Sequence, residues 1–164
     1  MKIILGTIVI LIALVLIITI IGLLLPKERI VSRQSVYRVS PKKLFEVVTD
    51  NSDWKYRTGL KDLIIIESTQ DKEVWDEVQE DGSVIRFNTR EKRPYSFYSF
   101  DMESKIFTGY WTAEFIEKGE NYTLFVATEH ISVKNPFIKT ISYLFFDIGK
   151  LMDVYQQDLK KRIN

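Results

Sequence analysis

Apolar residues recur at helical spacing in the C-terminal part of the chain. Between Pro136 and Lys161 they fall in alternating steps of three and four, at Ile138, Ile141, Phe145, Ile148, Met152, Tyr155 and Leu159. This spacing places them on one face of a helix, and Leu144 and Leu151 widen that face. Because proline suits a first helical turn, we predict one long amphipathic helix over 136–161 that packs against the rest of the domain.

Between residues 29 and 134 the pattern changes to short segments rich in β-branched and aromatic residues. After a first segment over 28–39, six more follow at hairpin spacing, over 61–69, 72–80, 83–91, 95–104, 107–117 and 121–134. Short turns such as Asp81-Gly82 separate them, so consecutive strands are antiparallel. In the first and last segments both alternate faces carry apolar residues, and the pattern leaves open which face points inward.

Two short helical pieces are predicted between the first and second strands. Ser40-Pro41 is a helix cap followed by proline at the first helical position. Leu44 and Phe45 belong to the buried side of the helix that follows, which ends near Asp50. The residues 54–57 are predicted to form a second helical piece.

The first residues form a separate apolar segment. Ile3 to Leu25 contains no charged residue, and a helix of this length spans a hydrocarbon core of about 30 Å. A cleaved signal peptide is the alternative, but the run exceeds the usual signal length and no small-x-small site precedes Pro26. We predict a retained transmembrane anchor over 1–26 and one domain over 27–164.

Basic residues after the anchor favour a cytoplasmic C-terminal domain in a single-pass membrane protein; an external domain on an uncleaved anchor is the alternative. Lys27, Arg29 and Arg33 are predicted to contact anionic lipid headgroups at the membrane surface.

Composition narrows the function classes. The chain has no cysteine and one histidine, which excludes disulfides, thiol catalysis and Cys- or His-rich metal sites. Apart from Lys2, the chain carries 22 basic and 22 acidic residues, and so neutral a domain argues against nucleic-acid binding. Glu129 and His130 are neighbours in a strand and point to opposite faces. We therefore predict no catalytic set, no metal and no cofactor.

The order of these elements resembles the START-like or Bet v 1-like superfamily, in particular the bacterial SRPBCC group of polyketide cyclases/dehydrases and lipid-transport proteins. The most specific piece runs from Ser35 through Pro41 to Asp50 and is followed by Trp54. The resemblance implies an α+β helix-grip fold, in which a curved seven-stranded antiparallel sheet surrounds a long C-terminal helix. It also implies an apolar cavity for lipids, sterols or polyketides between sheet and helix.

The predicted ligand cavity is built from bulky residues of the sheet and the helix. Its candidates are Trp54, Trp75, Phe87, Phe100, Trp111, Phe115, Glu129, Phe145, Ile148 and Met152. Arg38 or Glu129 would orient a ligand if either faces inward.

Three functions follow, in order of preference. The first is a membrane-anchored module that binds a hydrophobic or lipid-like ligand, with membrane lipids and an apolar small molecule as partners. The second is a cyclase or hydrolase of a hydrophobic substrate, and the third a cavity-free interaction module of a membrane complex. The oligomeric state stays open.

Overall fold

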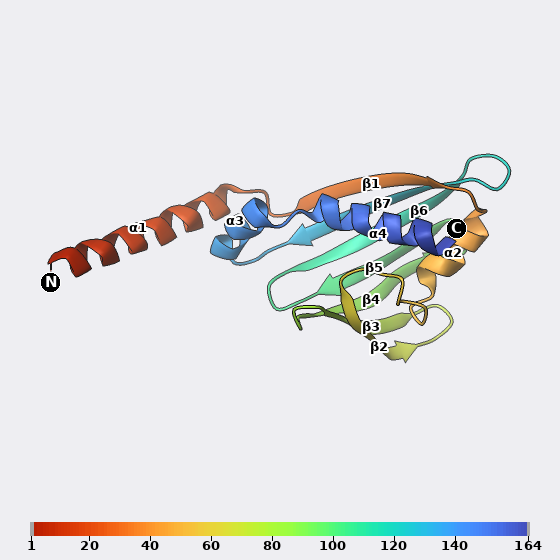
Figure 1. Ribbon diagram of the computed structural model, residues 1–164, viewed down its shortest axis with the longest axis horizontal. Coiled ribbons are helices and arrows are strands. Elements are labelled where there is room, and N and C mark those ends of the chain that lie inside the picture. The colour runs from red at the N-terminus through yellow and green to blue at the C-terminus, as the bar shows by residue number, and fades with distance from the viewer. Residues whose placement is uncertain (1, 164) are drawn as a thin grey trace.

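The computed structural model describes residues 2–163 and shows a long N-terminal helix joined to a domain made of one sheet and three helices (Figure 1). The helices are α1 (Lys2–Leu24), α2 (Pro41–Thr49), α3 (Pro136–Phe145) and α4 (Ile148–Ile163). The strands are β1 (Arg29–Tyr37), β2 (Leu60–Ser68), β3 (Glu73–Gln79), β4 (Val84–Arg93), β5 (Phe97–Glu103), β6 (Thr108–Glu117) and β7 (Thr123–Ser132).

All seven strands form one antiparallel sheet in the order β1-β7-β6-β5-β4-β3-β2. The sheet curves around α4, which lies along its inner face (Figure 1). Apolar side chains of that face, including Trp75, Trp111 and Phe125, are buried together with Met152 and Leu159 of α4. This arrangement is the helix-grip fold, and the prediction of a seven-stranded sheet around a C-terminal helix is confirmed.

The structure also shows which faces of the first and last strands point inward, a question that the sequence pattern left open. In β1 the residues from Val31 to Tyr37 alternate, with Tyr37 buried and Val36 exposed. In β7 the side chains of Phe125 and Ala127 are buried in the core. Glu129, two residues further along the same face, therefore points to the inside of the domain.

The prediction of a single helix over 136–161 is wrong, because the helix is interrupted at Phe146 and Asp147. The Asp147 carboxylate accepts a hydrogen bond from the backbone N–H of Lys150 at 3.1 Å, which is how a capping residue starts a new helix. The break turns Leu144, Phe145 and Leu151 outward, with 68%, 80% and 50% of their surfaces exposed. Of the predicted apolar face, Ile148, Met152 and Leu159 of α4 are buried against the sheet.

The helical piece predicted at 54–57 is a turn, in which the N–H of Arg57 donates to the carbonyl of Trp54 at 2.9 Å. The chain is held in this shape from outside, because the N–H of Thr58 donates to the carboxylate of Asp158 on α4 at 2.7 Å. This tertiary contact diverts the segment toward the C-terminal helix and places Arg57 against the inside of the domain.

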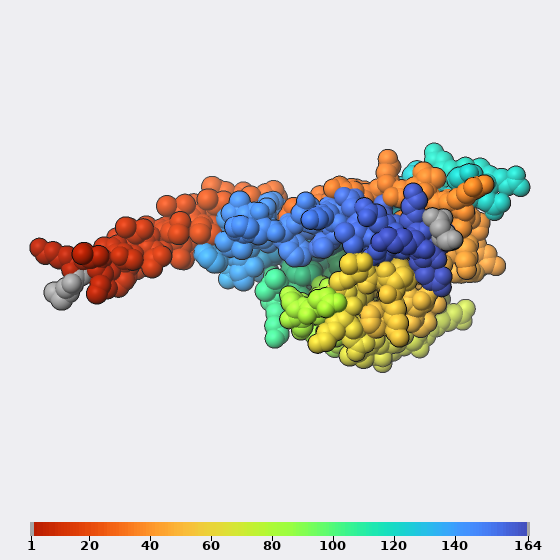
Figure 2. Space-filling model, viewed as in Figure 1, coloured from red at the N-terminus to blue at the C-terminus, as the bar shows by residue number. Residues whose placement is uncertain are grey.

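The helix α1 projects from one end of the domain, beside α3 (Figures 1 and 2). It is long and apolar enough to cross a membrane, a test that a signal sequence near an N-terminus also passes. Its last turns pack on α3, where the Thr140 hydroxyl donates to the carbonyl of Ile18 at 2.7 Å. A Cβ on Gly22 would lie 1.8 Å from the carbonyl oxygen of Pro136. Glycine is therefore what lets the two helices approach so closely.

Replacing Gly22 by leucine is expected to separate α1 from α3, because the added side chain meets backbone that cannot move aside. Hydrogen–deuterium exchange of the full chain in lipid nanodiscs should show loss of protection over 136–145. Gly6→Leu is the matched control, since a Cβ there meets nothing within 4 Å. Equal protection of α3 in both variants would contradict the expectation.

Candidate ligand-binding cavity

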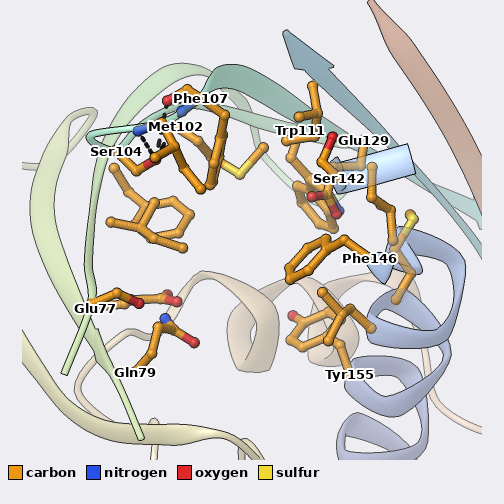
Figure 3. Close-up of a pocket in the computed structure, with 18 of the residues that line it drawn as sticks. Glu77, Gln79, Met102, Ser104, Phe107, Trp111, Glu129, Ser142, Phe146 and Tyr155 are labelled. Atoms are coloured by element: carbon orange, nitrogen blue, oxygen red, sulfur yellow. Dashed lines mark hydrogen bonds between the residues drawn. The ribbon is translucent and has the colours of Figure 1, made fainter. Parts of the chain in front are cut away.

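A cavity of about 920 Å³ lies between the inner face of the sheet and the helices α3 and α4 (Figure 3). Strands β3 to β7 contribute to its wall, and so do the β3–β4 turn and the β5–β6 turn at one end. A volume of this size is typical of small-molecule sites in proteins. The curved sheet leaves this space because its strands diverge from the single helix that they surround.

The sheet side of the cavity is an aromatic cluster. Trp75 and Phe87 stack with their ring centroids 5.1 Å apart, and Phe100 and Trp111 stack at 4.9 Å. The edge of Phe87 meets Phe100 at 5.3 Å and joins the two pairs. Each contact of this kind adds to the stability that burial supplies, so the cluster forms a firm apolar wall.

One polar group on this wall is fully paired. Glu77 lies on the inner face of β3, where only 4% of its surface is exposed. Its carboxylate binds the guanidinium of Arg57 at 2.6 Å and accepts a hydrogen bond from the Trp75 indole N–H at 3.1 Å. Burial lowers the pKa of Arg57, but the Glu77 carboxylate, with smaller contributions from Tyr155 and Tyr56, raises it more in sum, so the net shift is upward and the pair is ionic.

A second carboxylate, Glu129 of β7, lines the cavity without such a pair. Figure 3 shows it beside Trp111, on the wall opposite Glu77. Within residues 2–163 no side chain or backbone N–H donates a hydrogen bond to it, and no Lys or Arg forms a salt bridge with it. Burial raises its pKa from 4.5 to about 7, because removing the charged form from water costs free energy.

Most of the residues proposed for the cavity from the sequence lie around it. Its lining includes Trp75, Phe87, Phe100, Trp111, Glu129, Phe145, Ile148 and Met152. Trp54 and Phe115 are not among the residues that line it. Phe115 packs instead against Phe45 and Phe125, with ring centroids 5.2 Å away in both cases, and Trp54 is half-buried against the core.

The sequence interpretation missed Arg57, Glu77 and Tyr155 as cavity residues. A signal existed for Glu77, because it alternates with Trp75 in the same strand and therefore shares its face. No local signal marked Arg57, whose place depends on the turn that α4 holds. Tyr155 was predicted as part of the helix face, and its ring lies under the Arg57 guanidinium at 5.7 Å.

The basic residues that follow α1 hold the helices to the sheet. Arg29 donates to the carbonyl of Phe146 at 2.7 Å and lies over the ring of Tyr143 at 5.1 Å. Arg33 pairs with Asp153 of α4 at 2.9 Å. Lys27 lines the cavity near the start of the domain, whereas Arg38 is exposed and outside it. Of the two residues considered for orienting a ligand, only Glu129 faces inward.

His130 lies on the other side of the sheet from Glu129, as the strand alternation predicts. Its ring stacks on Tyr110 with centroids 4.0 Å apart, and its Nδ1 lies 3.4 Å from the carboxylate of Glu28. It does not line the cavity, so a reaction there cannot use both residues.

Solved structures with this architecture are similar to the chain. The protein TTHA0849 from Thermus thermophilus superposes with a TM-score of 0.71 at 15% identity, covering 82% of this chain and 97% of that one. For truncated norcoclaurine synthase from Thalictrum flavum the TM-score is 0.68 at 12% identity, and the superposition covers 83% of this chain and 93% of that one. For a START superfamily protein from Mycobacterium smegmatis the TM-score is 0.62 at 15% identity, and the superposition covers 82% of this chain and 96% of that one.

These likenesses establish the fold. The resemblance to START-like and Bet v 1-like proteins that the sequence suggested is confirmed at that level. No protein-family model and no curated protein matches the chain.

Proposed function

We propose that the protein is a membrane-anchored START-like module whose domain, residues 27–164, binds an apolar or lipid-like small molecule. The observation that carries the proposal is the cavity of about 920 Å³ with its stacked aromatic wall. A space of this size whose wall surface is mostly apolar suits a molecule that dissolves poorly in water.

The position of the cavity relative to α1 supports a ligand that comes from a bilayer. Pro26 and Lys27, which lie just beyond the end of α1 at Leu24, are among its lining residues. Exposed apolar side chains also border it, with Ile106 at 54%, Phe145 at 80% and Phe146 at 55% exposure. An anchor over residues 1–26 would keep this rim near the membrane, where apolar molecules concentrate.

Filling the cavity tests the proposal. The double variant Ile85→Trp/Ile131→Trp adds two large side chains at lining positions and is expected to reduce the bound ligand at least about tenfold. Native mass spectrometry of the full chain, purified in nanodiscs that carry its host's lipids, would measure the ligand retained.

The matched control is Ile64→Trp/Ile116→Trp, because both residues are exposed and lie outside the cavity. A cavity variant that retains as much ligand as this control would contradict the proposal. So would a wild-type protein that retains no more lipid or other small molecule than the cavity variant does.

A second candidate function is catalysis on an apolar substrate, and the observation that favours it is the unpaired Glu129 in the cavity. A carboxyl group with a pKa near neutrality is suited to general acid–base work. Glu129→Gln would then abolish turnover of a bound substrate while leaving its binding in place, whereas a binding module shows no turnover to abolish.

A further inference from the structure

Glu77 and Glu129, two of the acidic residues that line the cavity, differ in whether they have a partner. Glu77 has a cation and an indole N–H as partners. Glu129 has neither within residues 2–163, although both side chains point into the same space (Figure 3). Glu129 is half-buried and borders the cavity. An unpaired carboxylate with little access to water is costly, so the fold retains at Glu129 a group that its own residues leave without a partner.

The cationic side chains around the cavity do not compensate it. Arg57 is bound to Glu77, and Arg29 is bound to backbone carbonyls of α3 and of Phe146. Lys27, Lys105 and Lys139 also line the space, but none of them lies within salt-bridge distance of Glu129. The negative charge of Glu129 is therefore open to a cation that the ligand itself brings.

The surroundings of Glu129 suit a cation that is attached to an apolar body. Trp111 lies directly opposite it in the neighbouring strand, and aromatic faces attract cations. Ala127, Ile131 and Met152 supply apolar surface nearby in the lining. A molecule with one charged end and an apolar remainder would satisfy the carboxylate and fill the aromatic part of the cavity.

We infer that the cavity ligand carries a protonated amine, which the Glu129 carboxylate binds. This inference rests on the proposed function, since it names the chemical class of the ligand in the same cavity. Burial raises the pKa of Glu129 to about 7, so the carboxyl group is largely charged in mildly alkaline solution and can pair with an amine there.

Three matched compounds separate an amine from other polar ends: 2-(1-naphthyl)ethylamine, 2-(1-naphthyl)ethanol and 1-naphthylacetate. Each would be titrated calorimetrically at about pH 8 into the full chain in phosphatidylcholine nanodiscs, with empty nanodiscs subtracted. Because only the ammonium brings the opposite charge that an unpaired buried carboxylate lacks, the amine is expected to bind at least about tenfold more tightly than the alcohol.

Glu129→Gln keeps the size of the side chain and removes its charge. It should weaken amine binding about tenfold or more and leave alcohol binding within about twofold. Glu114→Gln, at an exposed position of the neighbouring β6, makes the same change in net charge and should alter neither.

The remaining outcomes are distinct. If amine and alcohol bind wild type equally, or Glu129→Gln weakens both alike, the assignment of an amine is overturned while ligand binding stands. If none of the three compounds binds wild type, both the amine assignment and the proposed function fail.

Discussion

Replacing Arg57 by methionine is expected to destabilise the domain by about 3–5 kcal/mol, because it leaves the Glu77 carboxylate buried without its cation. The guanidinium lies 2.6 Å from that carboxylate, and only 5% of the Glu77 side chain is exposed. The substitution keeps most of the apolar bulk of the arginine side chain, so the loss of unfolding free energy measures the effect of the uncompensated charge. Denaturant unfolding of the full chain in detergent micelles, followed by tryptophan fluorescence, would measure it.

The double variant Arg57→Met/Glu77→Gln is the matched control. It removes both charges and keeps a side-chain carbonyl for the Trp75 indole N–H, which donates to Glu77 at 3.1 Å. Removing a buried ion pair altogether is often close to neutral, so the double variant should recover most of the lost stability. A single variant that loses less than about 1 kcal/mol, the range of an exposed salt bridge, would show that the pair is solvated.

The alternation of apolar and polar residues predicted most of the fold, because it depends only on residues that are close in the sequence. Alternation along β5 and β6 places Tyr98, Met102 and Trp111 on one face, and all three are buried. The Asp81-Gly82 turn needs a positive backbone angle, and φ of Gly82 is 81°. Short turns then fix the antiparallel order of β2 to β7 without further information.

What the sequence could not provide depends on contacts between distant segments. The periodic apolar pattern continues through Asp147, so it did not reveal the break that exposes Phe145. Arg57, which pairs with Glu77, lies in the turn before β2 that a hydrogen bond to Asp158 of α4 holds. Alternation separated Glu129 from His130, but apolar residues on both faces of β7 hid which of the two lies in the cavity.

Glu129→Gln is expected to stabilise the protein in a pH-dependent way. The pKa of Glu129 is 4.5 in the reference state and about 7 in the fold, so folding disfavours the charged form. Below about pH 4.5 the carboxyl group is neutral in both states and contributes no penalty. As pH rises toward 7 the unfolded chain gives up its proton first, and wild type loses stability. Above pH 7 the full penalty is on the order of 3 kcal/mol.

The variant lacks this titration, so its advantage over wild type should grow from near zero at about pH 4.5 to on the order of 3 kcal/mol at about pH 8. Unfolding free energies of both proteins across this range would show it. Glu114→Gln, at an exposed position of β6, makes the same change in charge and is the matched control. A difference for Glu129→Gln that varies no more with pH than that of the control would mean that the carboxylate is solvated in the fold, and the cavity would then hold no unpaired charge for a cationic ligand to meet.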